Sequence, residues 1–302
     1  MNIIKYRKLW YLLSFLMVGG SLLAVAVFGL KQGIDFAGGS LVAIRFSGQR
    51  PSTVEAENAI ASLNLGSTTI QPVGEKDMNF RLRDMDEETH QKFIKELREK
   101  YGDITELRFD SIGPVIGQEL RSKSIIALIV VFLAILVYIT YTFRKVAVPM
   151  ASWKYGFITS LTAVHDVAVP IGVFAVLGRL HGLEIGTSFV AAILTVMGFS
   201  IHDTIVVLDR VRENLQRTSG LFEQIVNTSL NQTVVRSINT TISTLLALIA
   251  VYLLGGETVR DFSLALIIGI AVGAYSSIFI AAPLLVTWYK LDVKRKAGVQ
   301  GR

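Results

Sequence analysis

Ionisable side chains lie inside segments of this chain that are otherwise apolar, and these residues are the first candidates for chemistry. Asp166 follows His165 midway along one such segment, and Asp203 follows His202 near the end of the next. Arg236 begins a polar stretch in the segment after that. An ionised side chain in hydrocarbon costs at least about 2.5 to 3.5 kcal/mol, so such groups face one another or water. The residue types therefore predict a relay for protons, with Asp203, Arg236, Asp166 and His202 as its members.

Asp203 and Arg236 are the central pair of this hypothesis. They flank the same polar loop, so their helices are expected to be antiparallel neighbours. An aspartate beside an arginine stays ionised until a conformational change separates the two, which couples protonation to shape. The alternative is a fixed ion pair that only specifies helix packing, and the same alternative stays open for Asp166 with His165.

A polar stripe follows Arg236 at helical spacing and consists of Asn239, Thr240 and Ser243. Residues three and four apart share one face of a helix, so this stripe can hold water or bond a neighbouring helix. The alternative is that each hydroxyl satisfies the backbone of its own helix.

Several enzyme classes are excluded by what the chain lacks. It has no cysteine, and its four histidines show no metal-ligand spacing. No GxSxG, Walker A or GxGxxG pattern is present, so we expect neither covalent catalysis nor a metal or other cofactor. The chain is therefore predicted not to be an enzyme.

The distribution of charge favours a membrane over nucleic acid. Apolar residues make up 51% of the chain, and its net charge is +6. Residues 31–119 hold 11 Lys and Arg against 15 Asp and Glu, whereas the remainder holds 19 against 9. Basic residues beside apolar segments are typical of cytoplasmic membrane flanks, so no nucleic-acid partner is expected.

Six segments are long enough to cross a bilayer, which needs roughly 20 apolar helical residues. The fifth is the weakest, because its apolar part must draw in the polar stripe. Ala24 to Ala26 in the first resembles a signal-peptidase site, but the apolar run continues to Leu30 and favours an anchor. The predicted spans are residues 9–30, 125–143, 155–177, 186–208, 235–254 and 262–288.

Basic clusters fix the expected orientation. If six spans alternate, all the clusters fall on one side, which places both termini in the cytoplasm. We expect a first segment at residues 1–31, an extracytoplasmic domain at 32–121, the rest of the bundle at 122–289 and a basic tail at 290–302. The clusters include Lys5, Arg7, Lys8, Arg144, Lys145, Lys154, Arg210, Arg212, Lys290 and Arg302.

The polar region after the first span reads as a small α+β domain. Alternating residues at 41–46 and 79–83 predict half-buried strands, and strands are also expected at 68–73 and 104–109. Ser52 with Glu55 has the form of a capping box that opens a helix, and a second helix is expected from Asp86 to Tyr101. The order β-α-β-β-α-β predicts a ferredoxin-like fold without a catalytic constellation.

Motifs in this order resemble the SecF family of the bacterial Sec protein-export machinery, which belongs to the RND superfamily, and the resemblance covers almost the whole chain. One departure is His202, which stands where the family commonly has asparagine. The motifs are Gly33-Ile34-Asp35-Phe36-Ala37-Gly38-Gly39, Gly113-Pro114-Val115-Ile116-Gly117, His165-Asp166, the run from Gly198 through His202-Asp203 to Asn214, and Arg236-Ser237-Ile238-Asn239-Thr240-Thr241.

The resemblance implies a protein of the bacterial inner membrane that pairs with SecD and associates with the SecYEG channel. It implies that the proton gradient helps to draw unfolded exported polypeptide outward. The family's proton-pathway aspartate falls on Asp203 and its partner arginine on Arg236. Gly38 and Gly39 are interpreted either as a pivot or as a tight turn into the first strand.

Two alternatives to this function stay open. An RND-type exporter of small molecules or lipids has the same membrane physics but needs a substrate pocket. A scaffold that stabilises SecD and the channel without conducting protons is the other, and it should tolerate neutralisation of Asp203.

Overall fold

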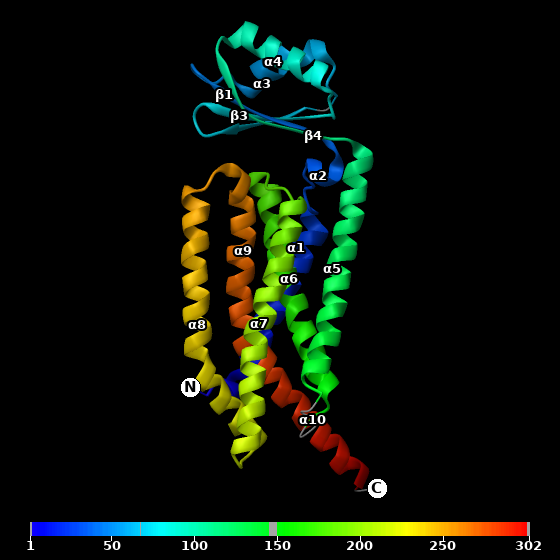
Figure 1. Cartoon of the computed structure of the whole chain (residues 1–302), viewed down its shortest axis with the longest axis vertical. Coiled ribbons are helices and arrows are strands. Elements are labelled where there is room, and N and C mark those ends of the chain that lie inside the picture. Colours follow the sequence, from blue (N-terminus) through cyan, green and yellow to red (C-terminus); the bar gives the residue numbers. More distant parts are fainter. Residues whose placement is uncertain (1, 67, 145–149, 301–302) are drawn as a thin grey trace. The chain divides into compact units, whose positions relative to one another are not determined.

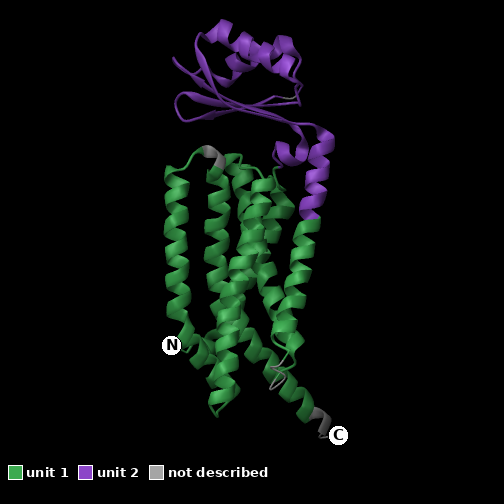
Figure 2. Cartoon of the chain, in the orientation of Figure 1, with its two compact units in different colours: residues 1–31, 126–302 green, residues 32–125 purple. Residues whose placement is uncertain are grey.

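The structure is a computed structural model that describes residues 2–66, 68–144 and 150–300. It divides into two compact units, residues 1–31 with 126–302 and residues 32–125 (Figure 2). Lys145 and Arg302, which belong to the predicted basic clusters, lie outside the described residues.

The first unit is a helical bundle in which six helices of the described chain are long and apolar enough to cross a membrane. The predicted number of spans is confirmed. The fifth is a continuous helix despite its polar stripe, and the hydroxyls of Thr240 and Ser243 there donate to carbonyls of their own helix. The helices are α1 (Arg7–Phe28), α5 (Pro114–Thr142), α6 (Ser152–His181), α7 (Thr187–Arg217), α8 (Phe222–Leu254) and the run of α9 (Glu257–Ser276), η3 (Ser277–Ala281) and α10 (Ala282–Gln300).

The helices of the bundle pack in a defined set of pairs. α6 packs against α1, α7 and α9, and both α7 and α9 pack against α8 and against each other (Figure 1). Near the chain termini, Glu223 at the start of α8 pairs with Arg7 of α1 at 2.8 Å and with Lys290 of α10. The carboxylate of Glu223 therefore links the first and last helices of the bundle.

The second unit is an antiparallel sheet with helices against one face (Figure 1). The strand order is β2-β3-β1-β4, which is that of the split-βαβ motif, so the predicted order of elements is confirmed. Its elements are β1 (Gly39–Phe46), α3 (Thr53–Ile60), η2 (Ala61–Leu63), β2 (Thr69–Val73), β3 (Asp77–Leu82), α4 (Glu87–Tyr101) and β4 (Ile104–Ile112), and a short helix α2 (Ile34–Ala37) precedes β1.

Local signals in the sequence determine where these helices begin. Ser52 and Glu55 form the predicted capping box at the start of α3. Asp86 caps α4 by accepting a hydrogen bond from the backbone N–H of Thr89 at 2.9 Å. Hydrogen bonds from Thr89 hold the pKa of Asp86 below its ordinary value. The apolar faces of α3 and α4 then cover a core that includes Phe80 and Phe93, whose rings meet edge to face at 5.2 Å.

The two glycine motifs of the second unit lie against each other. Gly38 and Gly39 have φ of 77° and 125°, conformations that glycine adopts without strain. A Cβ on Gly38 would lie 2.8 Å from Cα of Pro114, and one on Gly117 would lie 3.0 Å from the Gly38 nitrogen. The chain therefore turns tightly from α2 into β1, and α5 starts beside this turn. Gly33, Asp35 and Gly113 belong to the same two segments.

Replacing Gly38 with alanine should destabilise the start of β1. A left-handed conformation costs a non-glycine residue roughly 1 to 2 kcal/mol, and overlap with Pro114 adds to this cost. We expect hydrogen exchange of the β1 and β4 amides in the full chain to become about tenfold faster. Gly48→Ala is the matched control, because a Cβ at Gly48 meets no atom within 4 Å. Equal exchange in the two variants would contradict the assignment of strain to this turn.

Candidate functional site

Asp166 is the most deeply buried acidic residue of the described bundle, with 0% of its surface exposed. On α6 itself, Nδ1 of His165 lies 2.9 Å from its Oδ1. Two serine hydroxyls from other helices donate to its Oδ2: Ser200 of α7, and Ser276 of α9 at 2.6 Å. Three helices therefore meet at this carboxylate.

Asp203 forms the second buried carboxylate of the bundle and is 5% exposed. Ser237 of α8 donates to its Oδ1 at 3.1 Å. Ser277, the first residue of η3, donates to its Oδ2 at 3.3 Å. Because Asp203 lies on α7, this cluster joins α7 to α8 and to the last span.

The Asp166 cluster and the Asp203 cluster are neighbours on both α7 and the last span. Ser200 and Asp203 are three residues apart on α7, so they lie one above the other on neighbouring positions of the helix surface. Ser276 and Ser277 are consecutive on the last span. We call the six residues of these contacts the carboxylate–serine network. It consists of Asp166, Ser200, Asp203, Ser237, Ser276 and Ser277.

Glycines bring α9 close enough to α7 for these hydrogen bonds to form. A Cβ on Gly273 would lie 3.0 Å from Cβ of Ser200, and one on Gly269 would overlap the side chain of Val196. Small residues four apart permit close approach of membrane helices. The spacing of Gly269 and Gly273 therefore sets the distance at which Ser276 reaches Asp166.

The groups that surround the two buried acids are mainly neutral hydroxyls. Among the described residues, no lysine or arginine forms an ion pair with either carboxylate, and His165 is the one basic partner of Asp166. Neutral hydroxyl donors compensate only part of the cost of removing a carboxylate from water. The arrangement is therefore sensitive to protonation, because a proton removes the charge and turns an acceptor into a donor.

The predicted ion pair of Asp203 with Arg236 is not formed in the part of the chain that the structure describes. The predicted packing of α7 against α8 is present, but Ser237 occupies the position that faces Asp203. Successive helical residues point about 100° apart. Arg236 therefore lies on the exposed side of α8.

The other predicted site residues do not contact the two carboxylates among the described contacts. His202 is exposed, because the α7 face that buries Asp203 turns its neighbour outward. Asn239, Thr240 and Ser243 are exposed on α8, and the two hydroxyls donate to carbonyls four residues earlier at 3.0 and 2.8 Å. The hydroxyls of Thr240 and Ser243 therefore bond the backbone of their own helix.

Sequence reasoning did not include any of the four serines of the network among the site residues, although Ser237 directly follows Arg236. Ser200 was detectable in principle, because it lies three residues before Asp203 on the same helical face. Ser276 and Ser277 form a pair of hydroxyls in an apolar span, but nothing in their spacing identifies the helix that they face.

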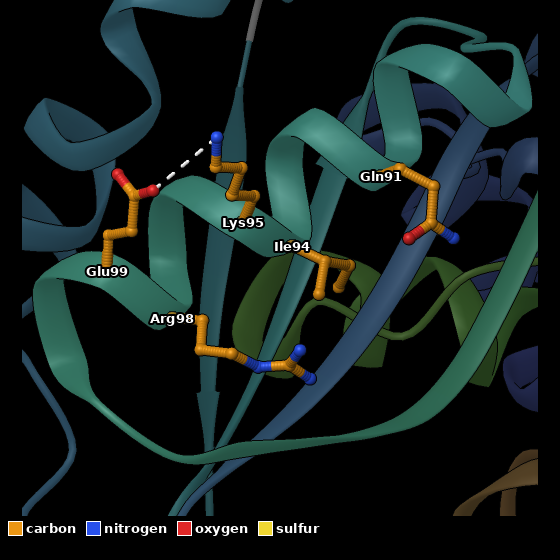
Figure 3. A pocket seen from close by; sticks show the side chains of 5 residues that line it. All are labelled: Gln91, Ile94, Lys95, Arg98 and Glu99. Carbon is orange, nitrogen blue, oxygen red and sulfur yellow. Dashed lines mark ion pairs between the residues drawn. The ribbon is translucent and has the colours of Figure 1, made fainter.

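Two cavities elsewhere are poorer candidates for chemistry. A shallow pocket of about 300 Å³ lies on α4 and is lined by Gln91, Ile94, Lys95, Arg98 and Glu99 (Figure 3). Its Lys95 and Glu99 pair with each other at 3.7 Å, which is an ordinary surface contact.

The second cavity, of about 420 Å³, lies within the bundle between α1, α5, α6 and α7. Ser21 supplies its one side-chain hydroxyl, and the other residues that line it, such as Phe132 and Met197, are apolar. The charged groups of the first cavity are exposed and the second cavity is almost wholly apolar, so neither holds buried acids as the carboxylate–serine network does.

Comparisons with known proteins agree on one family. Residues 92–291 match the family model "Protein export membrane protein SecD/SecF, C-terminal", and residues 23–49 match "SecD/SecF GG Motif". A protein translocase subunit SecF from Thermobaculum terrenum is 42% identical over 97% of this chain and 96% of its own length. The corresponding protein of Anaerolinea thermophila is 38% identical over 95% and 94%.

A solved structure shares the fold. The crystal structure of SecDF, a translocon-associated membrane protein from Thermus thermophilus, aligns with a TM-score of 0.83 and 31% identity over 96% of this chain. This chain spans 39% of the length of that SecDF chain.

Replacing Gly273 with alanine should loosen the contact that positions Ser276. Alanine favours a helix over glycine by up to about 1 kcal/mol, but the new methyl group crowds Ser200 and overpacking costs about 1 to 3 kcal/mol. We expect a lower midpoint of thermal unfolding for the full chain in detergent. Gly198→Ala on α7 is the control, since a Cβ there meets no atom within 4 Å, and it should unfold at the same temperature or higher. A stabilised Gly273→Ala variant would refute the close-approach argument.

Proposed function

Because this chain belongs to the SecD/SecF family of protein-export membrane proteins, we propose that it works with SecD to couple the proton motive force to late stages of export. It is a multi-pass membrane protein with a SecF-like role in protein export. The proposal adds the energy source, the residues that carry it and the wider assembly. In it, the chain lies in the bacterial inner membrane with both termini in the cytoplasm. It acts beside the SecYEG channel on unfolded exported polypeptide.

The observation that carries the proposal is the burial of Asp203 without a cation. Its carboxylate accepts hydrogen bonds from Ser237 and Ser277 at 3.1 and 3.3 Å, and no described lysine or arginine pairs with it. Ionisable groups inside membrane spans are costly and mark ion or proton pathways. A carboxylate held only by neutral donors gains or loses a proton without first breaking a strong ion pair.

Protonation of Asp203 changes contacts on three helices at once. A neutral carboxyl group holds Ser237 and Ser277 less strongly than a carboxylate does, because charged acceptors make stronger hydrogen bonds. The packing of α7 with α8 and η3 therefore has two states of different energy. A proton biases them only by the difference between its interactions in each state. Moving one charge across 100 mV supplies about 2.3 kcal/mol, which is the energy available to each proton.

Asp166 is the second carboxylate of the proposed route. Ser200, which donates to Asp166, lies on the same helix α7 as Asp203, and Nδ1 of His165 lies 2.9 Å from Oδ1 of Asp166. The mechanism needs no covalent intermediate. In this proposal, movement of the bundle reaches the α+β unit through α1 and α5, the helices that precede and follow it in the chain.

The exposed polar side of α8 is proposed as the surface that SecD covers. Arg236, Asn239, Thr240 and Ser243 are exposed along a helix that spans the membrane. Arginine in contact with lipid costs several kcal/mol, so a partner that offers polar groups is favoured over lipid at this face. We expect this partner to be SecD, because this chain belongs to the SecD/SecF family.

The two alternatives are less well supported. An exporter of small molecules needs a pocket with polar recognition groups, and the larger cavity of the described bundle is almost wholly apolar. A scaffold accounts for the helix packing but gives no reason to bury two carboxylates that no described lysine or arginine neutralises.

Asp203→Asn should remove the proton-gradient-dependent part of export. Asparagine keeps the shape of the side chain and one acceptor oxygen but never changes charge. We expect inverted membrane vesicles that carry this variant with SecD to lose most of the stimulation by the proton gradient, while the complex still assembles.

The matched control is Asp209→Asn on the same helix. Asp209 is exposed and forms a one-turn ion pair with Arg212 at 3.3 Å, so its loss should leave export within about twofold. Normal export by Asp203→Asn would favour the scaffold and end the proton-coupling proposal.

The proposed SecD surface is testable by cross-linking, because the chain has no native cysteine. Cysteine introduced at Asn239 should form a cross-link to SecD in membranes. Phe15 of α1, which is 74% exposed and apolar, is a lipid-facing control that should not. Cross-linking to SecD from Phe15 and not from Asn239 would place the partner on another face.

A further inference from the structure

Two neighbouring residues of the last span contact the two buried carboxylates separately. Ser276 donates to Asp166 at 2.6 Å, and Ser277 donates to Asp203 at 3.3 Å. Both serines have 0% of their surface exposed. One peptide unit of this helix therefore joins the acid of α6 to the acid of α7.

Each of these serine hydroxyls has a second acceptor in its own helix. Oγ of Ser276 lies 3.0 Å from the carbonyl oxygen of Gly273, and Oγ of Ser277 lies 3.1 Å from that of Ala274. A hydroxyl carries a single proton and donates fully to one acceptor at a time. Its proton therefore goes either to the carboxylate or to the backbone.

Protonation of a carboxylate decides between these two acceptors. An ionised carboxylate is the stronger acceptor, so it draws the hydroxyl proton. A protonated carboxyl group instead donates its own O–H to the serine oxygen, and the serine proton then turns to the backbone carbonyl. The charge on Asp166 or Asp203 thus determines whether Ser276 or Ser277 donates to the carboxylate or to a backbone carbonyl of the last span.

The backbone at this point departs from a regular α-helix. Residues 277–281 form the π-helical turn η3, and the helical run changes direction between α9 and α10 (Figure 1). Single π turns inside α-helices are rare, are associated with functional sites and cause kinks. The carbonyls of Gly273 and Ala274 belong to the helical turn just before η3, so additional hydrogen bonds to them act on this irregular segment.

We propose that Ser276 and Ser277 are positioning residues that couple the protonation of Asp166 to that of Asp203 through the π-helical turn. The proposal rests on the proposed function, because it explains how two acids act as one proton-dependent unit. When one carboxylate is neutralised, its serine shifts to the backbone, the turn readjusts, and the adjacent serine changes its hold on the other carboxylate.

Of the elements that contact both acids, only the last span has an irregular backbone, the π-helical turn η3, that can readjust. Asp166 faces His165 and Ser200, and the ring of Tyr275 lies 6.2 Å from that of His165. Asp203 faces Ser237. The other route between the acids runs through α7, which is a regular helix from Thr187 to Arg217 and offers no alternative turn.

The test measures the titration of Asp166 directly by difference infrared spectroscopy on the full chain in complex with SecD. Asp166→Asn assigns the signal. In the wild-type background, Asp203→Asn should shift the titration midpoint of Asp166 by at least about one pH unit, a tenfold change in the proton equilibrium. In the Ser276→Ala and Ser277→Ala backgrounds, the shift should fall to less than half.

Ser263→Ala is the matched control on α9. Ser263 is 1% exposed, and its hydroxyl donates to the carbonyl of Val259 at 2.7 Å, away from both acids. Its background should keep the full shift, as should Ser277→Thr, which retains the hydroxyl. The proposal is overturned if Asp203→Asn leaves the Asp166 midpoint unchanged, or if the shift survives both serine-to-alanine changes and therefore acts through space.

This readout is independent of export. If Asp203→Asn exports normally while the shift depends on the serines, the coupling stands and the proposed function fails. If export is lost and the shift does not depend on the serines, the proposed function stands and the coupling fails.

Discussion

A carboxylate inside a membrane bundle must find hydrogen-bond donors from the protein, and the packing of this bundle is arranged around that requirement. Asp166 and Asp203 draw donors from α7, α8 and the last span, so four spans converge on two side chains. The donors are mainly neutral hydroxyls, so no described lysine or arginine is needed to hold the acids in place. In the proposed function, the same contacts that order the helices also make their packing depend on protons.

Small residues make this arrangement physically possible. Gly273 lets α9 approach Ser200, and Gly269 lets it approach Val196. Lipid gives little driving force for helix association, so close van der Waals packing and interhelical hydrogen bonds carry more of the stability than they do in water. The network and the close packing support each other, since neither forms unless the helices are at this distance.

The α+β unit uses glycine for a different reason. Gly38 and Gly39 adopt backbone conformations that other residues avoid, and they let the start of β1 lie beside Pro114 at the start of α5. The chain enters and leaves this unit next to the same turn. Within the sheet of this unit, Arg45 and Asp77 pair across β1 and β3.

The sequence by itself determined the class of fold and the identity of the two acids. Hydropathy gave the six spans, the alternation of residues gave the four strands, and Ser52 with Glu55 and Asp86 marked two helix starts. These features are local, since they depend on periodicity and on hydrogen bonds between residues near in the chain. Family motifs then supplied the link to protein export.

The tertiary structure decided the partners of those acids. Sequence proximity suggested Arg236 for Asp203, but a one-residue rotation on α8 places Ser237 there and turns Arg236 outward. Ser276 and Ser277 reach the acids from 110 and 74 residues away, respectively, and the π turn beside them has no sequence signature. Such contacts depend on helix rotation and interhelical distance, which arise from the packing of the whole bundle.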